Sequence, residues 1–331
     1  MDEVERLPLP PRPERADGGE RRVGVEFEFG GLRPDAIVAA ITGSVGGRPE
    51  RRSPVQWLVH DTTVGDLRVE LDFALLQRVA EEVPGADVPE WILELSEWTT
   101  ELAERLASLV VPWEIVTAPV PLGSLHRLEG MIGALRDAGA LGTRYAPHYA
   151  FGVHLNPELP GLDAQTLVAY FQAYLLLNDW LRLRSRVDFA RWLSPYVDDF
   201  EDEWVRTVVV PWYRPTIEEF IDDYLAHNPT RNRRLDLLPL LAHLDEARVR
   251  AVLDDPLIKA RPTLHYRLPN CEIDDPRWGL RTIWEDWLEV ERLAADPERR
   301  ARMGRAYANW LGRFRLPFDE GWARESERWL A

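Results

Sequence analysis

Residues 24–31, with the sequence GVEFEFGG, alternate apolar and acidic side chains with the period of a β-strand. The apolar residues of this stretch share one face, whereas Glu26 and Glu28 share the other. Two carboxylates so close together repel each other unless water or a cation lies between them. Alone, such a pair is typical of the wet face of an edge strand, so the pattern indicates a metal site only if further acidic residues join it.

A second acidic strand is predicted at residues 67–73. Within the stretch LRVELDFALL, Glu70 and Asp72 share one face and the apolar residues share the other. The chain therefore carries the same arrangement of carboxylates twice. This repetition favours a common site where the two strands lie in one sheet.

Four more strands are predicted from short apolar stretches bounded by turn residues. They lie at residues 55–61, 113–122, 148–157 and 261–267. Together, the strands would bring carboxylate, imidazole and guanidinium groups to one sheet. The candidate side chains are Glu26, Glu28, Glu70, Asp72, Glu114, His154, Arg261, His265 and Arg267.

Helices are predicted where apolar residues recur at every third or fourth position. One begins at Pro34 and ends before Gly46, one is capped by Ser124 and ends at Gly139, and a long one begins at Asp163. Further helices are expected at residues 89–109 and after the capping boxes Thr216 to Glu219 and Thr282 to Glu285. Strands thus dominate the first half and helices the second, which predicts an α+β fold.

The candidate groups suit a hard divalent cation. Carboxylate oxygens with one imidazole fit Mg²⁺ or Mn²⁺, which take their remaining ligands from water and from nucleotide phosphates. The chain has no Cys or His cluster with the spacing of a tetrahedral zinc site and no glycine-rich loop of the Walker type. Nucleotide binding would therefore depend on the metal and on arginines of the sheet beside the phosphate oxygens.

His154 is the strongest imidazole candidate for a ligand. A histidine in a strand is more often a structural residue, but here Gly152 allows close approach and Asn156 lies on the same face. His60 and Asp61 are weaker candidates, because an aspartate followed by two threonines also signals a turn. The sequence leaves His154 open between a ligand and a structural residue.

Composition excludes several classes of partner. The formal net charge of −16 argues against a nucleic-acid surface or an anionic membrane, because binding to either needs clustered cations. The longest apolar run, residues 167–177, is too short to span a bilayer. The single cysteine, Cys271, cannot form an internal disulfide and fits a reducing compartment, which favours a cytoplasmic protein.

The chain is expected to form one catalytic domain behind a flexible tail. Residues 1–20 are rich in Pro, Glu and Arg and lack the pattern of a signal peptide. The domain would comprise residues 21–331, with helical elaborations at 75–110 and 163–255 and a helical C-terminus at 282–331. The extra helices could also bring a partner protein or a peptide to the sheet.

The order of the strand motifs resembles that of the putative amidoligase family, which is grouped with the glutamine synthetase-like carboxylate-amine ligases. The motifs are GVEFEFGG, WLVHDTT, EIVTAPVPL, FGVHLNP and RPTLHYR. The resemblance covers residues 22–160 and 255–285, and the helical second half adds little to it. It implies a curved, mainly antiparallel sheet of the glutamine synthetase-like catalytic type and an ATP-dependent ligase activity.

The resemblance also implies roles for particular residues. Glu26 and Glu28 match the metal-binding carboxylates of the family's first strand, and Glu114 matches the glutamate of its Glu-Ile-Val-Ser-Pro-Pro-like motif. His154 matches the histidine of the Gly-x-His-x-His-like strand, and Arg267 matches the arginine of the terminal Glu-Phe-Arg-like strand.

Two positions depart from the family pattern. Asn156 stands where a second histidine is common, and His265 stands where the last strand often has glutamate. One metal position would then be weaker or differently ligated, with Glu70 or Asp72 compensating. The expected metal ligands are therefore Glu26, Glu28, Glu70, Glu114 and His154.

A ligase of this kind is expected to work through an acylphosphate. A carboxylate reacts poorly with an amine because oxide is a poor leaving group, and transfer of the γ-phosphoryl of ATP, bound with Mg²⁺ or Mn²⁺, removes that obstacle. Arg261 and Arg267 would stabilise the transferring group and, with Asn156, bind the nucleotide. His265 is a candidate for the base that takes a proton from the amine.

Two other functions fit the same side chains. A phosphotransferase needs the same metal and arginines, and a catalytically silent relative would bind an acidic or nucleotide ligand through its helical half without turnover. For the ligase, the carboxylate and amine substrates are expected to be small molecules or peptides. No nucleic acid and no membrane is expected as a partner.

Overall fold

A computed structural model describes residues 6–72, 112–145, 151–185, 199–313 and 320–330. Within these ranges the chain forms one antiparallel sheet together with many helices, which confirms the predicted α+β class. None of the helices in this part of the chain is both long and apolar enough to cross a bilayer.

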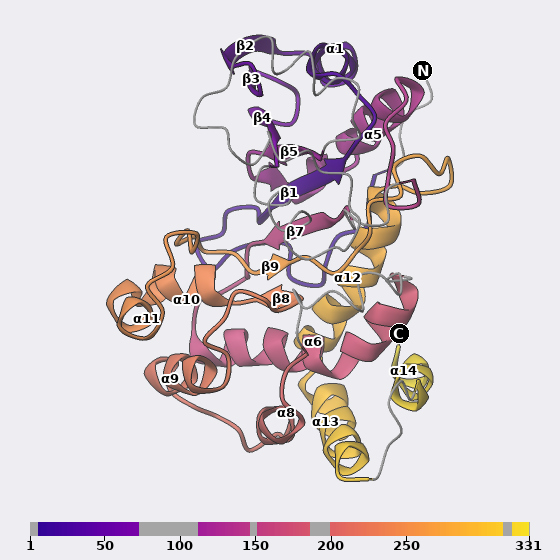
Figure 1. The fold of residues 1–331 in the computed structure, drawn as a ribbon. Coiled ribbons are helices and arrows are strands. Elements are labelled where there is room, and N and C mark those ends of the chain that lie inside the picture. The colour runs from indigo at the N-terminus through magenta and orange to yellow at the C-terminus, as the bar shows by residue number, and fades with distance from the viewer. Residues whose placement is uncertain (1–5, 73–111, 146–150, 186–198, 314–319, 331) are drawn as a thin grey trace, which may run out of the picture.

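The sheet gathers strands from both halves of the chain. The strands are β1 (Arg22–Phe29), β2 (Arg48–Ser53), β3 (Gln56–His60), β4 (Leu67–Leu71), β5 (Trp113–Thr117), β6 (Val120–Pro121), β7 (Val153–Pro157), β8 (Leu235–Asp236) and β9 (His265–Tyr266). Their spatial order is β2, β3, β4, β5, β1, β7, β9 and β8, with β6 paired to β1, and the pairs are antiparallel. They stack from β2 at the top of Figure 1 to β8 near its middle.

The central strand β1 has the two faces that its sequence predicts. Val25, Phe27 and Phe29 are each 0% exposed and lie in the hydrophobic core. Glu26 and Glu28 project from the opposite face. The antiparallel neighbours β5 and β7 flank β1 on both sides, so the two carboxylates lie in the middle of the sheet.

The helices of the first half pack together at one end of the sheet. They are α1 (Pro34–Val45) and α5 (Arg127–Asp137), and α1 also contacts β2, β3 and β4. The helices that follow β7 in sequence gather around the lower half of the molecule (Figure 1). These are α6 (Ala164–Arg184), α8 (Asp202–Val208), α9 (Ile217–His227), α10 (Leu238–Leu244), α11 (Glu246–Val252), α12 (Leu280–Ala295), α13 (Pro297–Leu311) and α14 (Gly321–Ser326).

Helices α6 and α12 pack against each other and cover the apolar side of β9. Tyr174 of α6 and Trp287 of α12 both contact Tyr266 of β9, with ring centroids 6.1 and 5.1 Å from it. Because successive residues of a strand point to opposite faces, His265 projects away from these helices. The polar face of the sheet is thus on the other side from α6 and α12.

Several predicted helix ends are confirmed. Helix α1 begins at Pro34, and Gly46 follows its end with a φ of 73°, a conformation that favours glycine. Asp163 caps α6 by accepting the N–H of the residue three positions on. Thr216 and Glu219 form the predicted capping box of α9.

The second predicted capping box, Thr282 with Glu285, is wrong. Helix α12 begins two residues before Thr282, and a carboxylate from another helix caps it: Glu129 of α5 accepts the Arg281 N–H at 2.6 Å. A Cβ atom on the preceding Gly279 would lie 2.5 Å from Glu129 Oε2, so a larger residue there would require the carboxylate to shift. A tertiary contact therefore replaces the local cap.

Two further helix predictions have different outcomes. Ser124 does not cap α5, because it lies in a short 3₁₀ turn (Leu122–Ser124) and the helix begins only at Arg127. The helix predicted at residues 89–109 lies outside the described residues, as does the whole of the elaboration expected at 75–110.

Two stretches of the sheet differ from the predicted strands. The strand expected at residues 261–267 is regular only at its two-residue core β9, because Pro262 has no N–H to donate. Strand β2, with the sequence RPERRS, was not predicted, because its side chains are almost all exposed and carry no apolar pattern. It pairs with β3 as an outer strand of the sheet.

Residues 6–20 differ from the flexible tail expected for residues 1–20. Leu7 is 5% exposed in the core, and the Pro8 carbonyl accepts the indole N–H of Trp284 at 2.8 Å. These contacts use one leucine and backbone carbonyls, which composition alone does not reveal. The boundaries proposed for the catalytic domain stay a prediction.

A buried ion pair joins the start of β1 to α12. Arg21 is 1% exposed and forms two hydrogen bonds with Glu291, at 2.9 Å from Nη1 to Oε2 and 2.6 Å from Nη2 to Oε1. Tyr170 of α6 donates to Glu291 Oε2, and Trp287 donates to Oε1 at 3.1 Å. The carboxylate is thus saturated with donors, as a buried charge must be.

We expect Glu291→Gln to lower the free energy of unfolding by about 3–5 kcal/mol, because it leaves the Arg21 guanidinium buried without a counter-charge. Urea denaturation measures this change. The matched control is Glu285→Gln, which removes a half-exposed carboxylate of the same helix from a pair with Arg281 and should cost less than about 1 kcal/mol. Equal effects of the two substitutions would contradict the prediction.

Candidate functional site

A row of carboxylates crosses three strands of the sheet. In the antiparallel register, Glu28 of β1 lies opposite Glu114 of β5, and Glu114 lies opposite Glu70 of β4. Directly opposed residues project to the same face, with Cβ atoms about 5 Å apart. The three carboxylates therefore stand side by side, and Gln56 of β3 continues the row beyond Glu70.

His154 of β7 lies against both glutamates of β1. Its Nδ1 is 2.9 Å from Glu26 Oε2, and its Nε2 is 3.5 Å from Glu28 Oε1. Glu28 also accepts the backbone N–H of Gly152 through Oε2, at 2.7 Å. The side chains that sequence alternation assigned to one face thus meet in the structure.

Asn156 links Arg261 to this group. Its Nδ2 donates to Glu26 Oε1 at 2.8 Å, and its Oδ1 accepts from Arg261 Nη2 at 2.8 Å. An amide suits this place between an anion and a cation, because it offers both a donor and an acceptor. Asn156 is therefore a neighbour of the carboxylates, at a position where a histidine would be common in the family that the sequence resembles.

His265 of β9 lies next to His154 and Glu26. The two imidazole rings meet edge to face with centroids 5.2 Å apart, and His265 Nε2 is 3.9 Å from Glu26 Oε2. Burial and the charge of Arg267 lower the pKa of His265 well below its usual value, so the ring is neutral at pH 7. Its Nε2 is buried and forms no hydrogen bond with any residue that the structure describes.

Arg267, the other predicted catalytic residue of this segment, is held by β8. Its Nη2 donates to Asp236 Oδ2 at 3.2 Å and to the Arg231 carbonyl at 2.8 Å. Asp236 is 1% exposed and lies opposite His265 in the sheet register. The sequence analysis missed Asp236, although an aspartate within the apolar run LDLLPLL was an available signal.

Glu70, at the end of the row, is the predicted metal ligand that already has partners of its own. Its carboxylate accepts from Gln56 Nε2 at 2.8 Å and lies 2.8 Å from Arg68 Nε, so its charge is already compensated. The sequence analysis did not include Arg68 or Gln56 among the functional residues. Both lie on the same face of their strands as Glu70.

Two overlapping groups of side chains could hold a cation. In each group, one ligand atom from every residue lies within 4.8 Å of the others. The groups are Glu26, His154 and His265, and Glu28, Glu114 and His154. Carboxylate oxygens together with a buried imidazole nitrogen that has no other partner fit a divalent cation.

The charge of the row raises the pKa of its middle member. Burial raises the pKa of Glu114 well above the usual value, and the neighbouring carboxylates raise it further. The neighbours concerned are Glu26, Asp72, Glu28 and Glu70. A proton on Glu114 or a cation between the carboxylates would relieve this repulsion.

Glu26 has the opposite protonation behaviour. Burial acts to raise its pKa, but the hydrogen bond with His154 and the electrostatic effect of the neighbouring imidazoles and of Arg261 outweigh burial and lower it. Glu26 is therefore ionised at neutral pH, whereas Glu114 next to it tends to hold a proton. The two carboxylates differ because the imidazoles and Arg261 lie on the side of Glu26.

Comparison with known protein families matches residues 19–289 to the family described as putative amidoligase enzyme. The match confirms the resemblance inferred from the strand motifs and extends it through the helical region between them. Comparisons with curated proteins and with solved structures found no match. Family membership implies that the protein is a ligase. With most of its length matched, the chain belongs to the putative amidoligase family.

Proposed function

We propose that the protein is an ATP- and divalent-metal-dependent carboxylate-amine ligase that acts through an acylphosphate, on a sheet of the glutamine synthetase-like type. The observation that supports this most directly is the polar face of the sheet. There, carboxylates from β1 and β5 lie within reach of two imidazoles, and Asn156 links them to Arg261. Such a face combines cation ligands with a phosphate-binding cation, which phosphoryl transfer requires.

Glu26, Glu28, Glu114, His154 and His265 would hold the metal ion or ions. A bound divalent cation would neutralise phosphate charge and fix the orientation of the nucleotide. The group of Glu26 with two imidazoles favours Mn²⁺ over Mg²⁺, because imidazole suits transition ions better than Mg²⁺. Glu70, which Arg68 and Gln56 already compensate, would contribute less to ion binding than the sequence suggested.

The arginines would act on the transferring phosphoryl group. In the first step, a carboxylate oxygen of the substrate bonds to the γ-phosphorus as the bond to the ADP oxygen breaks. Arg261, oriented by Asn156, and Arg267, oriented by Asp236, would stabilise the charge on the phosphoryl oxygens. Both guanidinium groups are thus positioned before substrate arrives, which lowers the cost of orientation.

The second step joins the amine to the activated carbonyl carbon. The amine nitrogen bonds to that carbon, phosphate leaves with the electrons of the C–O bond, and the nitrogen loses a proton. The neutral His265 would accept this proton through its unpartnered Nε2 if that nitrogen does not bind the cation. The same nitrogen cannot serve both purposes in one state of the site.

Trapping with hydroxylamine tests the proposal without knowledge of the natural amine. The protein, Mn²⁺ or Mg²⁺, ATP and hydroxylamine are incubated with a library of carboxylic acids, and hydroxamates are detected by mass spectrometry. A hydroxamate formed together with ADP supports the ligase. Phosphorylation of a single acceptor without hydroxamate would indicate a phosphotransferase, and nucleotide binding without any turnover would indicate a silent relative.

We expect Glu28→Gln to weaken Mn²⁺ binding by at least about tenfold while the protein stays folded, because glutamine can still accept the Gly152 N–H but supplies a neutral ligand. Calorimetric titration with Mn²⁺ alone measures the effect apart from catalysis, and the melting temperature should not fall. Glu70→Gln is the matched control and should change Mn²⁺ affinity less than about threefold. If Glu70→Gln lost more Mn²⁺ affinity than Glu28→Gln, the metal would bind at the Glu70 end of the row, and the prediction would be wrong.

We expect Arg267→Lys to keep metal-ATP affinity within a few-fold and to lower kcat for hydroxamate formation by about a hundredfold, because lysine keeps the charge but loses the planar fork. Asp236→Asn should also lower kcat, because Asp236 no longer holds Arg267 in position. The alternative is a purely structural pair between Arg267 and Asp236. In that case Arg267→Lys would lower the melting temperature and leave kcat unchanged.

A further inference from the structure

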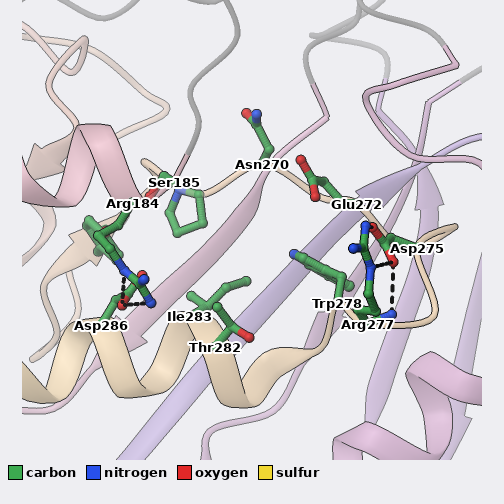
Figure 2. Close-up of a pocket in the computed structure, with 12 residues that line it drawn as sticks. Arg184, Ser185, Asn270, Glu272, Asp275, Arg277, Trp278, Thr282, Ile283 and Asp286 are labelled. Atoms are coloured by element: carbon green, nitrogen blue, oxygen red, sulfur yellow. Dashed lines mark hydrogen bonds and ion pairs between the residues drawn. The ribbon is translucent and has the colours of Figure 1, made fainter.

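A cavity of about 300 Å³ lies between the segment after β9, the end of α6 and the first turns of α12 (Figure 2). Tyr266, which is 0% exposed, lines it. Since Tyr266 and His265 are consecutive residues of one strand, the cavity lies on the reverse side of the sheet from the carboxylate row. It is therefore distinct from the candidate site.

The cavity is lined on one side by a carboxylate that has hydrogen-bond donors at only one of its two oxygens. Asp286 of α12 is 8% exposed, and both donors that reach it, Nε and Nη2 of Arg184, contact the same oxygen, Oδ1, at 3.1 and 3.0 Å. Its Oδ2 has no hydrogen bond from the described residues. Burial raises the pKa of Asp286 to about 6 in spite of Arg184, so the negative charge is only partly compensated.

A second carboxylate lies across the cavity from this pair. Figure 2 shows Glu272 on the opposite side from Arg184 and Asp286, and within the described ranges its carboxylate has neither a hydrogen bond nor an ion pair. The nearby Arg277 donates its Nε and Nη2 to the two oxygens of Asp275 at 3.1 and 2.9 Å, so it acts on Glu272 only as a nearby charge, as Arg144 does from outside the lining. With two arginines and three acids in its lining, the cavity carries one excess negative charge.

The remaining walls favour an organic ligand over a bare metal ion. The indole of Trp278 and the side chain of Ile283 line the cavity between the two carboxylates. Among the described residues, the groups able to hold a metal lie on the other side of the sheet and include neither Glu272 nor Asp286. Apolar walls next to uncompensated carboxylates suit a carbon skeleton that carries a positive charge.

We propose that this cavity is a second binding site, which takes a small organic ammonium compound. The ammonium group would lie between Asp286 and Glu272, and the carbon skeleton would pack against Trp278 and Ile283. This site does not depend on the ligase proposal, because it uses none of the side chains of the carboxylate row.

Three probes of equal length and different charge test the proposal by calorimetry at pH 7.5. They are 5-aminopentan-1-ol, which is a cation, pentane-1,5-diol, which is neutral, and 5-hydroxypentanoate, which is an anion. We expect the cation to bind with a Kd of about 1 mM or tighter, and each of the others to bind at least about tenfold more weakly. Equal affinities for cation and diol, or no binding of the cation up to 10 mM, would overturn the proposal.

Variants connect the binding to this cavity. Asp286→Asn and Glu272→Gln should each weaken binding of the cation by at least about tenfold, while Mn²⁺ affinity stays at the parent value. Glu285→Gln, at a half-exposed neighbour on the same helix, is the matched control and should bind the cation as the parent does. Parent-like binding by both cavity variants overturns the proposal, and if Asp286→Asn does not fold, Glu272→Gln alone decides.

Discussion

Repulsion among buried carboxylates is the constraint on which this sheet depends. Glu28, Glu114 and Glu70 stand opposite one another on adjacent strands, and the side chain of Glu28 is only 8% exposed. Glu70 and Glu114 are partly buried, so water screens the charges of the row only weakly, and each carboxylate needs a donor or a counter-charge nearby. Arg68 forms an ion pair with Glu70 at one end of the row, and His154 contacts both glutamates of β1 at the other end. Glu114, in the middle, keeps a raised pKa.

Arg68 lies on the same strand as Glu70, but the groups that compensate Glu26 and Glu28 come from strands that are distant in sequence, and the rest of the fold keeps those strands together. Strand β7 brings His154 and Asn156 to β1, and the chain reaches β9 only after the segment that contains helices α6 to α11. Helices α6 and α12 cover the reverse side of β9 through contacts with Tyr266. The buried pair of Arg21 and Glu291 then ties α12 back to the start of β1.

Strand β9 is short, but it separates two chemically different places. His265 faces the carboxylate row, where an unpartnered imidazole nitrogen and an arginine suit a cation and a phosphate. Tyr266 faces the cavity beside α12, where Asp286 and Glu272 suit an organic cation. The two proposals therefore concern opposite faces of one strand. Both follow from carboxylates that the described residues compensate only in part.

The sequence by itself determined which residues share a face and where several helices begin. The period of two in GVEFEFGG is enough to put Glu26 and Glu28 opposite a buried apolar face, and the capping box at Thr216 acts within one helical turn. Only the tertiary structure decided which residues of different strands stand opposite one another. Pairing register depends on strands far apart in the chain, so the alignment of Glu28, Glu114 and Glu70 has no local signal.

The same reason explains the errors and omissions. Glu129 caps α12 in place of Thr282, and Asp236 holds Arg267, although each lies more than thirty residues from its partner. A local sequence pattern reports only the helix or strand propensity and the alternation of side chains within a few residues. The partner of a buried charge is chosen by the packing of the whole chain, because the cost of leaving that charge uncompensated exceeds any local preference.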